Sequence, residues 1–444
     1  MTIAMAPAAR SLVRRYYVYA GVYTLAASVI WGINTLFLLD AGLSITGVFV
    51  ANAAFSVGTV LFEIPTGVTA DTVGRRASFL LSLAVLGAST LLYVGLAELS
   101  AGVVAFAGAS VLMGLGFTFY SGAMEAWLVD GLRGLGYEGS VDGVFATGQI
   151  VGGSAMLVGT VGGGVLGQID LALPFLVRSG LLIVLFVLAF AGMHDIGFEP
   201  RHVGIRALPR EMVASARLGV RAGWRRRSMR LLILGGAVQG GFFFWAWYAW
   251  QPYFLELLAD DAVWVAGVVA ALLAIAMMVG NGIVKYVTRW CGRRTTLLLW
   301  TAGVMTAASV AIGLAGTFVA ALAALLVLAV AMGVQNPVRQ GFIHEMTGSR
   351  ERATVVSFDS MIGGIASVGG QAGLGVYADQ TSYSAGYVVG GAVTVLALPI
   401  VWAVRRGEDP DDYFVGTQAA EPTGCTPQGI PAIASVEAKQ PAGV

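Results

Sequence analysis

The feature that most constrains this chain is a series of apolar runs of about 20 residues, the length that crosses a bilayer. Short polar breaks separate these runs from one another. Each run is long enough to span the hydrocarbon core as an α-helix, which rises 1.5 Å per residue. The composition agrees, because 57% of the residues are hydrophobic and only 11% are charged, with mean hydropathy +0.79. The chain is therefore predicted to be an integral membrane protein.

The apolar runs predict twelve transmembrane helices in two sets of six. The first set is expected near residues 16–39, 45–69, 77–97, 101–130, 142–168 and 171–193. The second set is expected near residues 230–257, 263–286, 295–315, 317–340, 354–377 and 384–404. The predicted fold is an all-α integral membrane protein with two pseudo-symmetric six-helix halves. The predicted divisions are an N-terminal half (1–193), a basic cytoplasmic linker (194–229), a C-terminal half (230–406) and a disordered cytoplasmic tail (407–444).

Basic residues mark one side of the predicted helices. With the N-terminus placed in the cytoplasm, Arg178 in helix six is the only one of the 26 Lys and Arg residues outside a cytoplasmic segment. The loops on the other side carry acids, namely Asp40, Glu98, Asp170, Asp260, Asp261 and Asp379. This distribution follows the positive-inside rule. We therefore expect a multi-pass protein of the cell (plasma) membrane with both termini in the cytoplasm.

The most distinctive polar break lies between predicted helices two and three and reads Gly67-Val-Thr-Ala-Asp71-Thr-Val-Gly74-Arg75-Arg76. A shorter copy, Gly292-Arg293-Arg294, follows the second helix of the second half. The pattern G-x-x-x-D-x-x-G-R-R in this position resembles the signature loop of the major facilitator superfamily. The resemblance extends over residues 12–405, because two six-helix halves joined by a basic linker are the architecture of these transporters.

The resemblance implies a conformational latch on the cytoplasmic side. Its expected members are Gly67, Asp71, Gly74, Arg75, Arg76 and Asp130. By analogy with the family, Asp71 would face the N-terminus of helix eleven, and one of the two arginines would reach Asp130 at the end of helix four. The glycines would permit close helix approach and a tight turn. These contacts would hold the halves together on the inside and stabilise the outward-open state; the alternative is that the residues only anchor the topology.

Three acids inside predicted helices are proton-coupling candidates, because an ionisable group within a membrane span is a functional hypothesis by default. They are Glu63, Glu125 and Asp359. Glu125 is preferred, because helix four is expected to line the cavity. In the alternative interpretation these acids extend the latch, and Asp359 stays ionised near the N-terminus of helix eleven. For Arg178 we expect a structural pair with an acid, and the alternative is an anionic group of the substrate.

The expected cavity is rich in aromatic residues. The family architecture places helices one, four, seven and ten around it, and helix seven carries an aromatic cluster from Phe242 to Tyr253. Trp245 and Tyr248 share one helical face, as do Trp247 and Trp250, and the sequence leaves open which pair faces the cavity. The predicted substrate-cavity residues are Asn34, Tyr120, Arg178, Trp245, Trp247, Tyr248, Gln335 and Asn336.

An aromatic, weakly polar cavity favours secondary active export of a hydrophobic or amphipathic molecule, such as a drug or secondary metabolite, by proton antiport with alternating access. The chain resembles the twelve-span drug:proton antiporter group, although Gly159-Thr160 replaces the Gly-Pro pair that this group carries in helix five. The alternatives are a uniporter or proton symporter for metabolite uptake, and a sensor or scaffold, against which the latch argues.

Other classes of function lack support in the sequence. It contains no phosphate-binding loop of an ATP-driven pump and no nucleophile–base set, so neither an enzyme nor catalytic residues are expected. Cys291, Cys425 and three histidines suggest no metal site or disulfide, and no cofactor is expected. The net charge of +1 argues against a nucleic-acid partner. The expected partners are the substrate, protons and the lipid bilayer, with the protein as a monomer.

Overall fold

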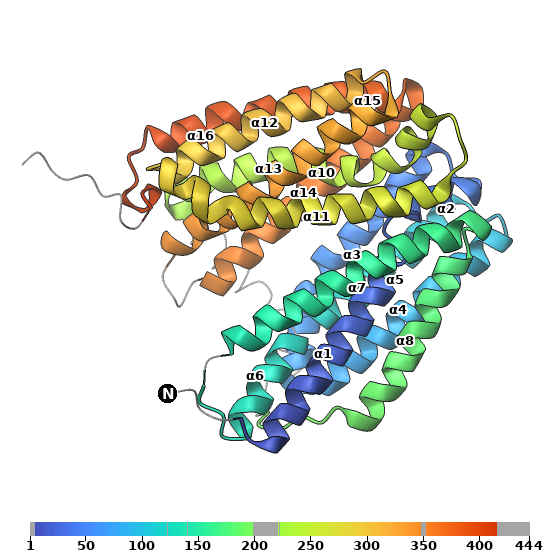
Figure 1. The fold of residues 1–444 in the computed structure, drawn as a ribbon, viewed down its shortest axis with the longest axis vertical. Coiled ribbons are helices and arrows are strands. Elements are labelled where there is room, and N and C mark those ends of the chain that lie inside the picture. The colour runs from blue at the N-terminus through green and yellow to red at the C-terminus, as the bar shows by residue number, and fades with distance from the viewer. Residues whose placement is uncertain are drawn as a thin grey trace, which may run out of the picture.

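The computed structural model describes residues 5–121, 123–139, 141–198, 221, 223–347 and 352–414. These residues form helices and turns without a β-strand, which confirms the predicted all-α fold (Figure 1). The N-terminal half contains α1 (Pro7–Ser28), α2 (Asn34–Asp40), α3 (Ile45–Thr72), α4 (Arg75–Glu98), α5 (Val103–Ser121), α6 (Met124–Gly134), α7 (Asp142–Ile169) and α8 (Leu173–Gly192). The predicted basic linker lies mostly outside the described residues.

The C-terminal half repeats this arrangement of helices. It contains α10 (Arg227–Leu258), α11 (Val263–Trp290), α12 (Arg294–Leu314), α13 (Phe318–Glu345), α14 (Arg352–Gln380), α15 (Tyr383–Val393), η2 (Thr394–Leu396), α16 (Ala397–Arg405) and η3 (Pro410–Asp412). Within the described chain, ten helical stretches are long and apolar enough to cross a membrane. The other two predicted spans are α1–α2, which is interrupted, and α14, which is rich in glycine.

The first predicted helix is broken at residues 29–33, whereas the sequence favoured one continuous span. Backbone groups freed within a membrane need partners, and Gln251 of α10 supplies them. Its Nε2 donates to the carbonyl oxygen of Trp31 at 2.9 Å, and its Oε1 accepts from the Thr35 backbone N–H at 2.9 Å. The fourth predicted span is also interrupted, between α5 and α6. Apolar composition alone signals neither break.

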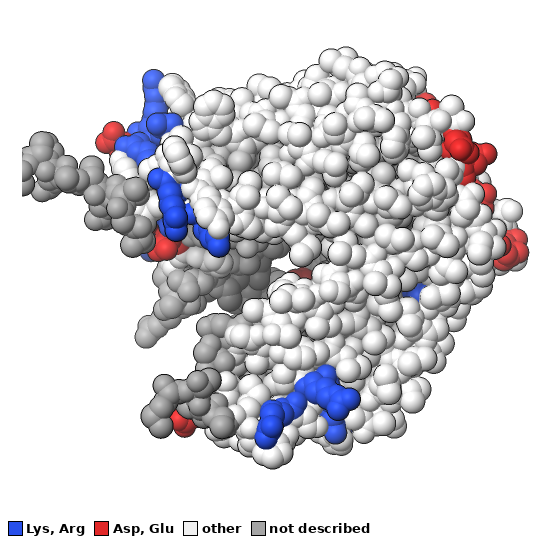
Figure 2. Space-filling model, in the orientation of Figure 1, with Lys and Arg blue, Asp and Glu red and all other residues white. Residues whose placement is uncertain are grey.

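The two halves meet at one end of the molecule and diverge at the other (Figure 1). Figure 2 shows most basic side chains around the open end, with some acidic ones beside them, and acidic side chains around the closed end. The open end, termed the basic end, carries Arg15, Arg76, Arg133, Lys285 and Arg293. The closed end, termed the acidic end, carries Asp40, Glu98, Asp170, Asp261 and Asp379. The basic residues therefore gather at one end of the molecule, as their distribution along the sequence predicted.

Contacts between the halves concentrate toward the acidic end. There α3 packs against α14, α7 against α11, and α2 against α10. Thr46 of α3 donates to Asp379 of α14 at 2.7 Å, and the ring of Phe49 stacks on Trp245 with centroids 5.6 Å apart. Phe49 therefore belongs to the same buried hydrophobic cluster as Trp245 and Tyr387 of the C-terminal half. The halves share a core at this end. The N-terminal half also has a core of its own along its length, and the C-terminal half has a second core toward the basic end.

Each half ends with an acid that binds the start of its own third helix. After α8, Asp195 Oδ1 accepts from the Arg76 backbone N–H at 2.9 Å. After α16, Asp412 accepts from the backbone N–H of Thr295 at 2.7 Å and from its hydroxyl at 2.6 Å. Residues 407–414, which the sequence assigned to a disordered tail, are therefore ordered against the C-terminal half; the tail from residue 415 lies outside the described residues.

Candidate substrate cavity

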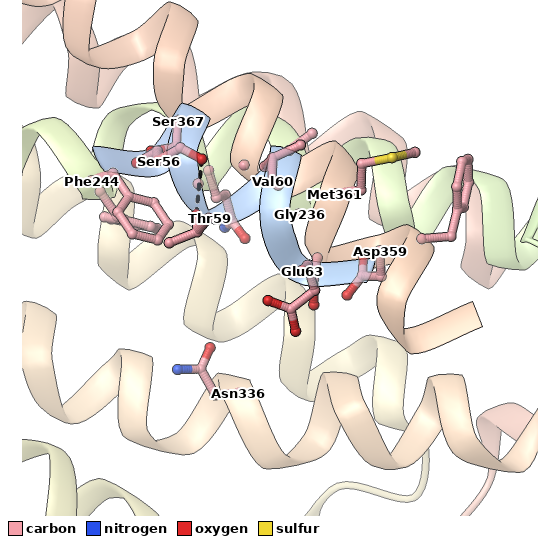
Figure 3. Close-up of a pocket in the computed structure, with 18 of the residues that line it drawn as sticks. Ser56, Thr59, Val60, Glu63, Gly236, Phe244, Asn336, Asp359, Met361 and Ser367 are labelled. Atoms are coloured by element: carbon pink, nitrogen blue, oxygen red, sulfur yellow. Dashed lines mark hydrogen bonds between the residues drawn. The ribbon is translucent and has the colours of Figure 1, made fainter. Parts of the chain in front are cut away.

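A cavity of about 890 Å³ lies between the two halves, and residues of both halves line it (Figure 3). Its walls come from α3 and α5 of the N-terminal half and from α10, α12, α13 and α14 of the C-terminal half. Helix one, which was expected at the cavity, contributes no lining residue among those described. The helix-two and helix-eleven segments take its place, because α3 and α14 pack against each other across the boundary between the halves.

A large apolar part of the cavity wall is aromatic or sulfur-containing. These side chains are Phe55, Phe117, Phe243, Phe244, Phe358, Met305, Met332 and Met361. Phenylalanine rings offer large apolar contact areas, and methionine side chains adapt to irregular shapes. Glycines of α10 and α14, among them Gly236 and Gly364, also line the cavity and leave space between these side chains because they have none of their own. The cavity is therefore suited to the apolar body of an organic molecule.

Several of the polar groups in the wall already bind one another. Gln335 Nε2 donates to Gln239 Oε1 at 2.6 Å, and its Oε1 accepts from the Thr301 hydroxyl at 3.0 Å. Across the two halves, the Ser56 and Ser367 hydroxyls lie 3.3 Å apart. Gln335 is therefore largely committed within the protein, although it was predicted to contact substrate and does line the cavity.

One wall of the cavity contains an ion pair that was not predicted from the sequence. Arg339 of α13 donates to both carboxylate oxygens of Asp359 of α14, at 2.8 and 2.5 Å. Both side chains are about four-fifths buried, at 18% and 19% exposure. The charge pattern of the sequence assigns Arg339 to the cytoplasmic end of helix ten. Its position four residues after Gln335, on the same helical face, was the signal that placed it in the cavity.

Glu63 of α3 is the unpaired acid of the cavity. Its side chain projects into the space that faces Asn336 of α13 (Figure 3). Among the described residues, the Glu63 carboxylate makes neither a hydrogen bond nor an ion pair. Asn336 is likewise exposed in the wall. These two polar groups are therefore available to a bound molecule.

Glu125, the preferred proton carrier from sequence, lies elsewhere. It occupies the first turn of α6, beyond the break in helix four, and its side chain is exposed. It is not among the residues that line the cavity, whereas Phe117 and Ser121 of α5 are. The break between α5 and α6 separates the two stretches, so helix four contributes to the cavity without Glu125.

The helix-seven tryptophans do not line the cavity. Trp245 is completely buried and packs against Tyr387 with ring centroids 5.1 Å apart, while Trp247 is half-buried outside the wall. The wall-facing residues of α10 recur at helical spacing through Gln239 and Phe243. Farther along α10, Tyr248 and Gln251 meet α2 instead, because the halves are closed at that level. Phenylalanines therefore replace the predicted tryptophans.

Three predicted cavity residues lie within the N-terminal half. Asn34 donates to Asn52 at 3.0 Å, and the Tyr120 ring stacks on Tyr23 with centroids 3.5 Å apart. Arg178 is buried, with 7% exposure, near the phenol groups of tyrosines from α1, α4 and α10. Contrary to the expected structural pair, no acid among the described residues contacts this arginine.

The residues of the predicted latch contact one another within the N-terminal half. Arg75 donates to Asp71 at 2.6 Å, and its Nε lies 3.5 Å from Asp130 Oδ2. Arg76 instead donates to the carbonyl oxygen of Phe190 at 2.8 Å. Gly74 has φ +130°, which favours glycine. The expected link from Asp71 to the start of helix eleven falls partly on residues 348–351, outside the described residues.

A family model described as Major Facilitator Superfamily matches residues 17–300 and 265–438 of the chain. The chain belongs to the Major Facilitator Superfamily. Membership in this superfamily and the apolar helices make it a multi-pass membrane transporter. No curated protein matches the sequence.

Solved structures of superfamily-like transporters share this fold at low sequence identity. The nucleoside transporter NupG is 11% identical with TM-score 0.74, over 89% of this chain and 99% of its own. The human organic anion transporter MFSD10 (TETRAN) is 16% identical with TM-score 0.60, over 89% and 100%. A bacterial homolog of the human lysosomal transporter Spinster, in an inward-facing and occupied conformation, is 15% identical with TM-score 0.66, over 93% and 100%.

Proposed function

We propose that this protein exports a hydrophobic or amphipathic organic molecule across the plasma membrane in exchange for protons. The positive-inside rule assigns the basic end to the cytoplasm and places both termini there. On that assignment the structure is an inward-facing state, because the halves part at the basic end (Figure 2). The cavity then receives its cargo from the cytoplasm, and closure of the basic end with opening of the acidic end releases it.

The observation that carries this proposal is an aromatic cavity with one unpaired carboxylate. A volume of about 890 Å³ falls within the range of small-molecule pockets, roughly 300–1,000 Å³. Phenylalanine and methionine side chains supply the apolar part of the wall, and several of its polar groups, among them the Gln335 amide and the Asp359 carboxylate, are already bound by other side chains. A sugar needs dense hydrogen bonding, so this wall favours a bulky apolar body with few polar groups.

Glu63 is the proposed proton-coupling residue. It faces the cavity without a partner, whereas Asp359 is held by Arg339. An acid in a low-dielectric wall binds a proton more readily when no cation is near. Cargo that enters from the cytoplasm and donates a hydrogen bond to the ionised Glu63 carboxylate would favour loss of its proton, and exposure to the other side would allow reprotonation. Substrate and proton thus compete for one site, which is the requirement for antiport.

The test uses purified protein in liposomes with an imposed pH gradient and an internal fluorescent pH dye. The panel contains lipophilic amines and antibiotics, together with a nucleoside, an aromatic carboxylate, a dipeptide and a sugar. We expect lipophilic compounds to trigger proton movement in the wild type and in Glu125→Gln, but not in Glu63→Gln. Flux of a hydrophilic metabolite alone would favour the uptake alternative, and undiminished proton movement in Glu63→Gln would exclude that residue as the coupling site.

A further inference from the structure

Arg178 of α8 is a buried cation without an acidic partner. Its side chain is 7% exposed, and its Nε atom is buried without a hydrogen-bond partner. Among the described residues, Arg178 takes part in none of the ion pairs. A charged side chain in a membrane span is costly unless it is paired or hydrated. The presence of a charged arginine in this environment therefore needs an explanation, and no acid among the described residues provides one.

Phenol groups from three helices lie near the arginine. Tyr23 of α1, Tyr93 of α4 and Tyr248 of α10 are its electrostatic neighbours. A phenol hydroxyl can donate a hydrogen bond to an anion. The Phe175 ring lies one helical turn away from Arg178 and packs on Phe37 with centroids 4.1 Å apart. The Tyr93 hydroxyl already pairs with that of Ser110. The site thus combines one permanent positive charge with neighbouring phenols and an apolar wall, and this combination favours an anion attached to an aromatic or aliphatic body.

We propose that Arg178 binds the anionic head group of the transported molecule, a carboxylate or a group of the same shape. A planar guanidinium matches a carboxylate with two parallel hydrogen bonds. This inference rests on the proposed transport of an amphipathic organic molecule and adds the charge class of that molecule. The apolar body of the molecule extends from the head group toward the central cavity.

The route from the cavity to Arg178 follows α5. Phe117 and Ser121 of α5 line the cavity, and Tyr120 of the same helix stacks on Tyr23. Tyr23 is in turn a neighbour of Arg178. These aromatic neighbours form the route by which a molecule in the cavity would bring an anionic group to the arginine.

Closure of the acidic end covers the same site. Tyr248 belongs to the C-terminal half, and its carbonyl oxygen accepts a hydrogen bond from the Thr35 hydroxyl at 3.0 Å. Separation of α10 from α2 at this end would withdraw Tyr248 from Arg178 and expose the guanidinium. The head-group site would therefore become accessible from the acidic end when the transporter changes state.

The experiment compares 2-naphthoate with 2-naphthamide, which share a ring system but differ in charge, on the full-length protein in detergent. Ligand-dependent thermal stabilisation gives the affinity of each probe. We expect the wild type to prefer the carboxylate by about tenfold or more, the gain typical of charge-assisted hydrogen bonds. Arg178→Gln should remove this preference, and Arg178→Lys should keep part of it. Arg133→Gln, which removes an exposed arginine of the same half, is the matched control.

Equal affinity of the two probes for the wild type would overturn the proposal, and this result needs no variant to fold. An unchanged preference in Arg178→Gln would also overturn it, as would equal stabilisation by chloride, which indicates a site for an inorganic ion. The liposome test of the proposed function distinguishes failure of the Arg178 site from failure of the antiport. Proton-driven flux of neutral amphiphiles without charge preference would remove only the Arg178 site. Arg178-dependent binding of naphthoate without proton-driven flux of any compound would remove only the antiport.

Discussion

The carboxylate of Asp195 accepts a hydrogen bond from the backbone N–H of Arg76, with an O···N distance of 2.9 Å. The segment after α8 is thereby bound to the first turn of α4, where unpaired N–H groups favour an anion. Burial raises the pKa of Asp195 above its ordinary value, although the Arg76 N–H and the charges of Arg76 and Arg75 act in the opposite direction. The contact therefore satisfies a helix end but carries a desolvation cost when the acid is ionised.

Replacement of Asp195 separates these two effects. We expect Asp195→Ala to lower the free energy of unfolding by about 1 kcal/mol, the usual effect of losing a helix cap. Asp195→Asn keeps an acceptor without a charge and should match or exceed the wild type at neutral pH. Because the folded-state pKa is raised, the cost of ionisation disappears as the pH falls through it. The stability difference between Asp195→Asn and the wild type, measured by thermal unfolding, should shrink on acidification; a growing difference would contradict this assignment.

The Arg339–Asp359 pair predicts strong non-additivity. Arg339→Gln or Asp359→Asn alone leaves one charge without its partner in the cavity wall. Each should cost about 1–3 kcal/mol, between the values for exposed and fully buried pairs. The double variant should cost less than the sum of the two. Thermal unfolding of all four proteins provides the cycle, and additive effects would show that the two charges do not stabilise each other.

Gln251 predicts a shift in the population of conformations. Gln251→Ala removes two hydrogen bonds between α10 and the break in helix one, and each is worth about 1 kcal/mol. The acidic end should therefore open more often. A cysteine at Thr35, which is fully buried in this structure, reports opening through reaction with a membrane-impermeant maleimide. Because about 1.4 kcal/mol is a factor of ten, its labelling rate should rise by about thirtyfold in the Gln251→Ala background. Equal rates in the two backgrounds would show that Gln251 does not hold this end closed.

Gly67 predicts a difference between folding and transport. A Cβ atom at Gly67 would meet no atom within 4 Å in this structure, whereas one at Gly164 would lie 2.7 Å from the Gly267 Cα atom. Gly67→Leu should therefore leave thermal stability nearly unchanged. It should slow transport, because closure of the basic end requires helices to approach this position. Gly164→Leu, the matched control, should destabilise the folded protein. Normal transport by Gly67→Leu would show that Gly67 does not take part in closing the basic end.

The sequence was most informative where physical rules act along the chain. Runs of apolar residues predicted the helices, and the one-sided arginines, such as Arg76 and Arg293, predicted which ends lie together. The faces of the helices were harder to predict, because they depend on the other half. Trp245 is as aromatic as Phe243, yet it packs in the core because α10 meets Tyr387 on that side. Arg339 escaped notice because its partner Asp359 is on another helix.

The two acid-to-helix contacts, at Asp195 and at Asp412, have a consequence for how the chain is assembled. In each half the segment after the last helix is hydrogen-bonded to the start of the third membrane-spanning helix of the same half. This contact does not depend on the other half. Because α3 packs on α14 and α7 on α11, protease cleavage between residues 198 and 221 should leave two fragments that co-purify as one particle, each with its own contact intact. A purification tag fused immediately after α16 would instead displace Asp412. The fusion point therefore decides whether the contact between Asp412 and Thr295 forms.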